Sequence, residues 1–288
     1  MADTTGQADL RKEFVDGAVK AVALMEYKLK TLCTVSSSSA WTESYYRETN
    51  TDLTANGTGN SVKGIPRLAN FPYGEASWTK VSSVIEKYGM EGVISYEDKM
   101  LDNIPMIERT VLRIGRAVAK AVDTQILSEM SSGAGNSHAI TADYEWDSAT
   151  VANRDPVFDI LSAIQTLRAD NINALNGMGY LVINGTDYTN VISNSKFTNN
   201  ASYKSADVIT NGVVGEIAGL KVMVSEVIPA DEAYVVVAKE AMTWKEATPL
   251  TVLQVEDPGV KTTIRAFELG TLQLVSPNAV CKITNTRA

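Results

Sequence analysis

The longest regular pattern of apolar and polar positions lies in residues 103–130, which read NIPMIERTVLRIGRAVAKAVDTQILSEM. Apolar residues recur there at every third or fourth position, which is the repeat of one helix face. The apolar stripe consists of Ile104, Ile107, Val111, Ile114, Val118, Val122 and Ile126. Pro105 suits a first helical turn, and Gly133 and Gly135 follow the last repeat. The pattern predicts one helix of about 26 residues, roughly 39 Å long, with one buried face.

A second stripe on the same predicted helix is basic. The basic stripe consists of Arg109, Arg113, Arg116 and Lys120. These residues also step by three or four positions, and they fall opposite the apolar stripe. The stripe is either a solvated face or a surface that meets an anion. That anion is nucleic-acid phosphate or an acidic segment of a neighbouring subunit, for example around Glu75.

Shorter patterns predict helices and strands on both sides of the long helix. Helical spacing indicates a first helix over 8–32, capped by Asp9. Another helix follows over 155–171, with Asp155 as its cap and Pro156 at its first position. The remaining predicted elements are a strand at 89–97, a strand at 179–185, a short helix at 186–195, and a strand-rich region from 212 with a turn at 256–259. The class is α+β, and we find no internal repeat.

Two segments before the long helix have no apolar pattern of their own. Residues 34–61 are rich in Ser, Thr, Asn and Gly, and they predict a long polar loop or arm. Residues 62–80, VKGIPRLANFPYGEASWTK, interleave proline, glycine and aromatic residues, which predicts an extended, hairpin-like excursion. Such a segment cannot alone bury enough surface to offset its ordering entropy. We therefore expect a large closed homo-oligomer rather than a monomer.

Charge and cysteine content exclude several classes of protein. The net charge of −8 argues against an isolated domain that reads DNA sequence, because such domains usually carry a basic surface. Cys33 and Cys281 are too few for a disulfide framework, so we expect buried free thiols, with a single pair as the alternative. The polar start of the chain, MADTTGQADLRKEF, does not resemble a signal peptide. No apolar run of about 18 residues predicts a membrane helix.

The residues required for catalysis or metal binding are sparse. His138 is the single histidine of the chain, and its surroundings, SSGAGNSHAI, indicate a solvated loop residue. One histidine and two distant cysteines cannot complete a zinc site. Glu97, Asp98 and Asp102 would suit a hard cation, but carboxylates at the positive end of a helix are the simpler interpretation. No nucleotide-binding motif is present. We expect no enzyme, cofactor or metal, although a hydrolase or binding module with an unrecognised site stays open.

The order of the elements resembles a known family. The stretches that carry the resemblance are KGIPRLANFPYGEASWT (63–79), GVISYEDKMLDNIPMIERTVLRIGRAVAKAVDTQIL (92–127), GYLVINGTDYTNVI (179–192), GVVGEIAGLKVMVSEVIPADEAYVVVAKEAMTWK (212–245) and PNAVCKIT (277–284). Together they resemble the major capsid protein of tailed bacteriophages and related archaeal viruses, whose fold encapsulins share. The resemblance covers most of the chain beyond the polar arm.

The resemblance implies a fold with an N-terminal arm (1–58), an extended loop (59–95), a peripheral domain containing the long spine helix (96–150 and 245–288), and an axial domain (151–244). It implies an icosahedral shell of hexamers and pentamers around double-stranded DNA, located in the virion and made in the host cytoplasm. Scaffold, portal and decoration proteins are further implied partners, and a membrane is not. Because the arm that precedes the loop is short, either a separate scaffold protein serves or the chain is a matured form.

Particular residues acquire roles through the same resemblance. We expect the extended loop to contact a neighbouring subunit through Pro66, Phe71, Pro72 and Trp78. The basic stripe is expected to face the lumen. An encapsulin-like compartment around a cargo protein is the alternative. Encapsulins typically dock cargo on a Trp-containing N-terminal helix, and here the nearest tryptophan, Trp41, lies outside the first helix, which favours a virus.

Overall fold

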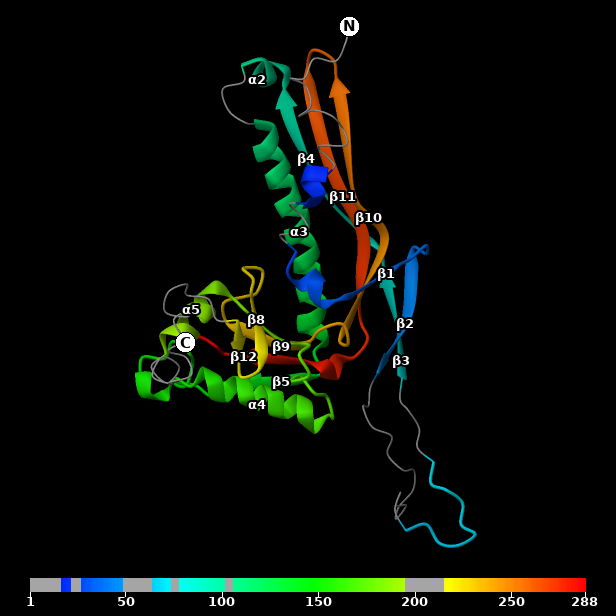
Figure 1. Ribbon diagram of the computed structural model, residues 1–288, viewed down its shortest axis with the longest axis vertical. Helices are drawn as coiled ribbons and strands as arrows, with labels where there is room; N and C mark the ends of the chain where they lie inside the picture. Colours follow the sequence, from blue (N-terminus) through cyan, green and yellow to red (C-terminus); the bar gives the residue numbers. More distant parts are fainter. Residues whose placement is uncertain (1–16, 22–26, 49–63, 74–77, 102–105, 195–214) are drawn as a thin grey trace. The chain divides into compact units, whose positions relative to one another are not determined.

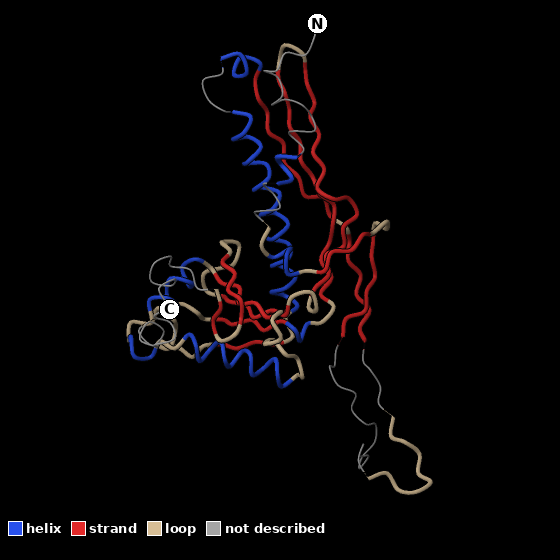
Figure 2. The backbone as a smooth tube through the Cα atoms, viewed as in Figure 1, coloured by secondary structure: helices blue, strands red, loops and turns tan. Residues whose placement is uncertain are grey.

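The computed structural model describes residues 17–21, 27–48, 64–73, 78–101, 106–194 and 215–288. The chain divides into two compact units. Unit 1 comprises residues 1–43, 83–129 and 243–273, and unit 2 comprises residues 44–82, 130–242 and 274–288. Helices and strands occur in both units, as expected for an α+β protein (Figure 2).

Unit 1 is built on a four-stranded sheet with the order β1-β10-β11-β4. Its strands are β1 (Thr34–Ser37), β10 (Met242–Asp257), β11 (Lys261–Leu274) and β4 (Glu86–Ser95). β10 and β11 follow one another through a turn at 258–260, as the EDPG sequence predicts. β4 pairs antiparallel with β11 along its whole length. β1 adds in parallel to the other side of β10.

The long helix α3 (Met106–Gly133) confirms the helix predicted from the apolar stripe (Figure 1). Val111, Ile114, Val118, Val122 and Ile126 are all buried. The helix packs closely on β4, because a Cβ atom on Gly92 would lie 2.3 Å from Thr110 Cγ2 and 2.8 Å from Ile114 Cδ1. Glycine is therefore needed at position 92 to allow this contact. A short helix, α2 (Tyr96–Leu101), separates β4 from α3 and was not predicted.

Unit 2 contains a six-stranded sheet with the order β5-β12-β9-β6-β8-β7. Its strands are β5 (Asn136–Ala139), β12 (Val280–Thr284), β9 (Glu232–Val237), β6 (Gly179–Ile183), β8 (Leu220–Val224) and β7 (Glu216–Ile217). Short 3-10 turns lie at η3 (Val151–Asn153) and η5 (Pro277–Ala279). The consecutive residues 233–237 of β9 are all buried, which shows that both faces of this central strand are covered.

Two helices of unit 2 confirm their sequence predictions. Helix α4 (Pro156–Ala169) begins after Asp155, whose carboxylate accepts a hydrogen bond from the Phe158 backbone N–H. It packs on β5 and β12 (Figure 1). Helix α5 (Gly185–Ser193) begins after Asn184, whose side chain accepts a hydrogen bond from the Thr186 backbone N–H. Both caps satisfy backbone donors that a helix start leaves unpaired.

The polar segment 34–61 was predicted to be a loop, which is wrong for two stretches of its described part, whereas residues 49–61 lie outside the described residues. Residues 34–37 form β1, and residues 42–48 form β2 (Thr42–Glu48), which pairs with β3 (Trp78–Val84) in a two-stranded sheet. The hairpin character expected for the extended excursion is therefore present, although it starts earlier. The first helix is described only at 17–21, and residues 29–32 form a 3-10 turn, η2 (Leu29–Leu32), instead of its predicted end.

The compact units do not coincide with the expected domains, whose boundaries stay a prediction. Residues 130–150 and 274–288 were expected beside the long helix, but they belong to unit 2. The reason is strand pairing: β5 lies beside β12, and β12 pairs with β9. The pairing of β5 with β12 could not be predicted from the sequence, because the two strands are far apart in it. β5 directly follows the long helix, and β12 is the last strand of the chain.

Candidate functional site

The hairpin formed by β2 and β3 and the segment 64–73 between its strands carry several large apolar side chains that are open to solvent. Of the four residues predicted to contact a neighbour, Phe71 is 82% exposed, Trp78 is 54% exposed, Pro66 is exposed and Pro72 is half-buried. Other exposed side chains in the hairpin, or directly before it, were not singled out as contacts from the sequence. They are Trp41, Tyr46, Leu68 and Tyr73.

The segment 64–73 is held by little besides a local turn. Within the described residues, its backbone forms one hydrogen bond, from Ala69 N–H to Pro66 O at 3.1 Å. The base of the hairpin is better anchored, because Glu48 N–H donates to Val275 O at 3.0 Å. Arg47 Nε also donates to Leu274 O, at 3.3 Å. Exposed apolar surfaces of this kind are typical of protein–protein contacts in folded proteins.

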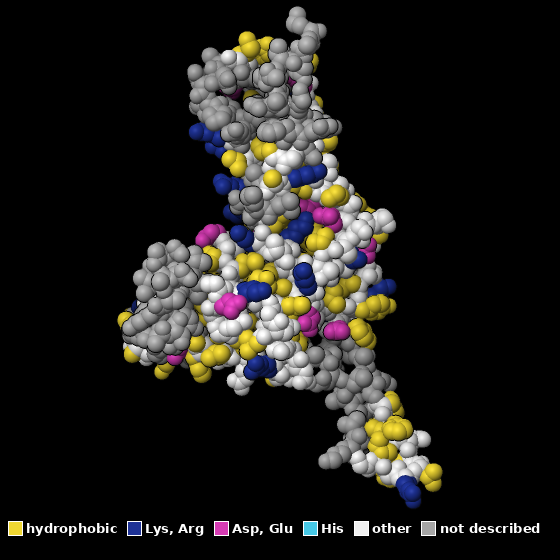
Figure 3. All heavy atoms as spheres, in the orientation of Figure 1, with side chains coloured by type: hydrophobic (Ala, Val, Ile, Leu, Met, Phe, Trp, Pro, Cys, Tyr) yellow, Lys and Arg dark blue, Asp and Glu magenta, His cyan; other side chains and the backbone are white. Residues whose placement is uncertain are grey.

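The basic stripe on α3 lies on the exposed side of the helix. Arg109, Arg113, Arg116 and Lys120 are exposed. Figure 3 shows basic side chains gathered along the helix in the upper part of the view. Within the described part of the chain, Arg109, Arg113 and Lys120 form no ion pair with an acidic side chain. The arrangement therefore offers positive charge to an external anion; Glu75, the acidic residue considered above, lies outside the described residues.

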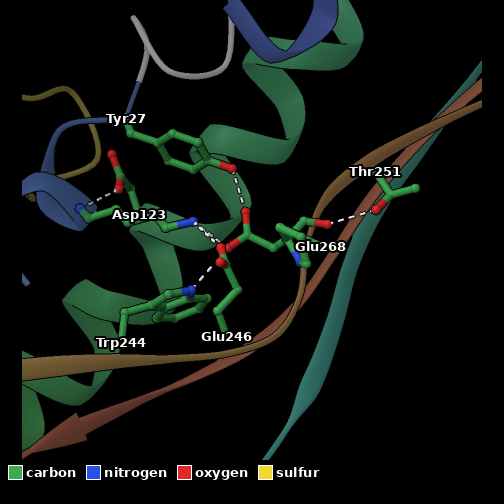
Figure 4. A network of polar contacts seen from close by, with 8 residues as sticks. Tyr27, Asp123, Trp244, Glu246, Thr251 and Glu268 are labelled. Atoms are coloured by element: carbon green, nitrogen blue, oxygen red, sulfur yellow. Dashed lines mark hydrogen bonds and ion pairs between the residues drawn. The ribbon is translucent and has the colours of Figure 1, made fainter. Parts of the chain in front are cut away.

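A buried polar cluster in unit 1 was not foreseen from the sequence. It consists of Tyr27, Lys30, Asp123, Trp244, Glu246 and Glu268. Figure 4 shows the Glu268 carboxylate between the Tyr27 and Trp244 side chains. Tyr27 Oη donates to Glu268 Oε2 at 2.6 Å, and Trp244 Nε1 donates to Glu268 Oε1 at 2.9 Å. Lys30 Nζ lies 2.6 Å from Glu268 Oε1 and 3.0 Å from Glu246 Oε1.

The same cluster fastens the chain to the middle of α3. Asp123 accepts hydrogen bonds from the backbone N–H groups of Lys28, at 2.8 Å, and Lys30, at 3.1 Å. Burial raises the pKa of the Asp123 carboxyl group, and these hydrogen bonds oppose the rise. Burial and the Glu268 charge raise the pKa of Tyr27. Both oxygens of Glu268 already accept hydrogen bonds, so the cluster serves to hold residues 27–33 in place rather than to bind a substrate.

The two cysteines are buried free thiols, as predicted. Burial raises the pKa of Cys33 to about 12 and that of Cys281 to about 11. Both groups are therefore protonated and unreactive at neutral pH.

His138 was wrongly predicted to be a solvated loop residue. It lies in β5, and its Nε2 is 3.3 Å from Asp159 Oδ1. The other oxygen of Asp159 accepts a hydrogen bond from Trp146 Nε1 at 3.0 Å. Burial raises the pKa of Asp159, while the bonds from Trp146 and His138 lower it. His138 and Asp159 border a cavity of about 260 Å³ between β5 and the start of α4.

Glu97 and Asp98 occupy the first turn of α2, which fits the helix-start interpretation, whereas Asp102 lies outside the described residues. In the described ranges, no three His, Cys, Asp or Glu side chains are placed to hold a metal ion. None of the helices there is long and apolar enough to cross a membrane.

A comparison with family models identifies one family. The sequence model of a family described as "Phage capsid protein" matches residues 78–283. A comparison with curated proteins gives no match.

Solved structures share the fold of the chain. The capsid of the cyanophage P-SCSP1u is 13% identical with a TM-score of 0.67, and the match covers 90% of this chain and 88% of that one. The capsid of a native GTA particle is 13% identical with a TM-score of 0.62, covering 92% and 91%. A virus-like particle from Pyrococcus furiosus is 11% identical with a TM-score of 0.64, covering 94% and 98%.

Proposed function

The chain belongs to the phage capsid protein family, and from this premise we propose how it builds a shell. Hexamers and pentamers of this one chain close an icosahedral shell around double-stranded DNA. Unit 1 takes the peripheral role and unit 2 the axial role in each subunit. The shell is the capsid of the virion and is made in the host cytoplasm. Scaffold, portal and decoration proteins are its further partners.

One observation carries the proposal: the apolar side chains along the hairpin and its tip, 64–73, have no cover among the described residues of their own chain. Phe71 and Trp78 are the largest of the four predicted contact residues. A buried aromatic side chain removes about 150–250 Å² from water, at roughly 25 cal/mol per Å². When every subunit makes a contact of this size, the contacts together stabilise a closed shell. In an isolated subunit the same apolar surface stays exposed to water.

The basic stripe of α3 supports the DNA part of the proposal. Packaged DNA presents phosphate at high density, and positive side chains that contact phosphate need not read the sequence. Four cations per subunit offset part of the repulsion between the DNA and a chain of net charge −8. A compartment shell that encloses a cargo protein is the alternative, and it would have no need of this stripe.

The test starts from the purified chain, with or without its scaffold. Sedimentation and negative-stain microscopy should show large closed particles, and particles isolated with their contents should hold double-stranded DNA. Trp78→Ala should lower the yield of particles at least several-fold while the circular dichroism of the chain stays unchanged. Tyr96→Ala, which removes another exposed aromatic side chain outside the hairpin, is the matched control and should assemble normally.

Three outcomes would contradict parts of the proposal. If the wild-type chain sediments only as a monomer or dimer under all conditions, the shell is wrong. If Trp78→Ala assembles like the wild type, the hairpin is not a subunit contact. If the particles hold a protein and no nucleic acid, the compartment alternative is right.

A further inference from the structure

The cavity beside His138 has the shape of a socket for a side chain. It measures about 260 Å³, which is below the roughly 300–1,000 Å³ of pockets that hold small molecules. Tyr144 and Phe158 stand at its rim, and Phe158 is 63% exposed although it is a large apolar residue. Ile140 and the His138–Asp159 pair line the inside. We call these five residues the socket.

A second apolar feature of unit 2 is the loop 171–178, between α4 and β6. Met178 is 49% exposed and Leu175 is also exposed. The loop is stiffened by its own asparagines, because Asn173 Oδ1 accepts from Leu175 N–H at 3.1 Å and Asn176 Oδ1 accepts from Met178 N–H at 3.0 Å. A preorganised loop loses little entropy when it binds. Methionine also adapts its shape to irregular gaps.

The socket and the loop lie at opposite ends of the same sheet. The strands β5, β12, β6 and β8 all run in one direction, because β5 is parallel to β12, β6 is parallel to β8, and β9 is antiparallel to both β12 and β6. The socket lies at the C-terminal end of β5, which carries His138, whereas the loop precedes the first residue of β6. A strand of the length of β6 spans about 16 Å, so the loop cannot enter the socket of its own copy.

We propose that neighbouring copies of unit 2 pack head to tail, with the loop 171–178 of one copy seated in the socket of the next. The proposal rests on the shell function, and it names the faces through which axial domains meet. The contact joins two different surfaces, so a copy that binds through its loop still has its socket available for another copy. Further copies can therefore be added until the last one meets the first and a ring closes. Both surfaces are already apolar and exposed, as such a contact requires.

The two surfaces carry charges of opposite sign, although Asp170, which directly precedes the loop, is acidic as well. Asp155 borders the socket cavity, and Asp159 lies inside it. On the other side, Lys221 Nζ lies against the loop, 3.0 Å from Gly177 O. Glu216 lies opposite Lys221 in the β7–β8 register and reduces the positive charge there. The apolar fit therefore supplies most of the stability, and the charges set the orientation.

The test is a disulfide trap in assembled particles. The natural cysteines, Cys33 and Cys281, are both buried, so they should not form disulfides with the introduced ones. Particles of the double variant Phe158→Cys, Met178→Cys are mildly oxidised and run on a denaturing gel without reductant. We expect a ladder of linked chains reaching five and six copies. Each single variant should run as a monomer, and so should Phe158→Cys combined with Val260→Cys, an exposed residue of unit 1.

The outcomes separate this contact from the shell function. Normal particles without a ladder would overturn the contact and leave the shell function intact. A dimer band from either single variant would also overturn it, because it would show that like surfaces meet. If the double variant does not assemble, Tyr144→Cys with Leu175→Cys probes the same two surfaces, and the absence of a ladder there overturns the proposal. Failure of the wild-type chain to form particles would instead contradict the shell function.

Discussion

Lys30 is the residue on which the buried polar cluster depends. It is the single cation in the cluster, and it faces two carboxylates, Glu246 and Glu268, at 3.0 and 2.6 Å. Its Nζ also lies 4.7 Å from the centre of the Tyr27 ring, where a cation is attracted to the aromatic face. Without Lys30, the fully buried Glu268 would lose the cation that neutralises it.

We therefore predict that Lys30→Met lowers the free energy of unfolding of the full chain by about 3–5 kcal/mol, as measured by urea denaturation. The exposed ion pair between Arg265 and Glu91 is the matched control, because its side chains are 44% and 48% exposed. Arg265→Gln should cost no more than about 1 kcal/mol. Equal losses for both variants would show that the cluster contributes no more than a surface pair.

Asp187 is a second buried acid, in the first turn of α5. Thr286 Oγ1 donates to its Oδ2 at 2.9 Å, and its Oδ1 has no hydrogen-bond partner among the described residues. Burial raises the pKa of Asp187 to about 6, and the nearby charges of Asp147 and Asp231 add to the rise, while Thr286 and Arg287 oppose it. The ionised form is therefore the less favourable one in the folded chain.

Because of this pKa shift, we expect the free energy of unfolding to depend on pH. The folded pKa of about 6 lies above the value of about 4 in the unfolded chain, so folding is favoured as the pH falls through 6 towards 4. Between pH 7.5 and pH 5, Asp187 should add about 1.4 kcal/mol to the free energy of unfolding. The free energy of unfolding is measured by urea denaturation at the two pH values, and the Asp187→Asn variant should not show this gain. The control variant Asp143→Asn changes an exposed acid and should keep the gain. If Asp187→Asn has the same pH dependence as the wild type, Asp187 is not the group responsible.

At the scale of elements, α3 carries an apolar stripe and a basic stripe on opposite sides of one helix. Its apolar stripe fixes the sheet of unit 1, as the burial of Val111 through Ile126 and the close approach at Gly92 show. The four members of its basic stripe are all exposed. Changes to the basic stripe should therefore alter what the helix binds without altering the fold.

We predict that the double variant Arg113→Gln, Arg116→Gln forms empty shells normally but gives filled shells that release DNA at lower temperature. The reason is the loss of two phosphate-contacting charges per subunit, and the effect should be largest at low salt. Release is measured by dye binding during heating. Lys87→Gln with Lys261→Gln removes the same charge from the exposed sheet strands of unit 1 and is the control.

The alternative for the stripe predicts a different result. If the arginines pair with an acidic segment of a neighbouring subunit, the double variant should fail to form even empty shells. That result would rule out DNA as the main partner of the stripe.

At the scale of the molecule, the family match includes only one strand of the exposed hairpin, β3. The match spans residues 78–283, so the strands β1 and β2 lie before it. The segment 64–73 lies outside the match, and its apolar side chains are exposed within the part of the chain that the structure describes. We therefore expect the exposed part of the hairpin, 64–73, to gain its stability from contacts with a neighbouring subunit.

The sequence by itself determined the elements whose signals are local. The 3.6-residue repeat of Val111, Ile114, Val118 and Val122 predicted α3, and Asp155 with Pro156 predicted the start of α4. The EDPG turn and the buried strand β6 were equally clear. In each case a few neighbouring residues carry both the pattern and its physical cause, which is burial of one face or the capping of free N–H groups.

The tertiary structure decided what depends on contacts between distant residues. The residues TVSS at 34–37 were read as part of a polar loop, and they form a strand because they pair with the edge of β10. His138 is half-buried because Asp159 reaches it from α4, and Glu268 is buried because Lys30, from near the start of the chain, neutralises it. No local pattern encodes such pairs, since a charged or polar residue looks the same in sequence whether water or a distant partner satisfies it.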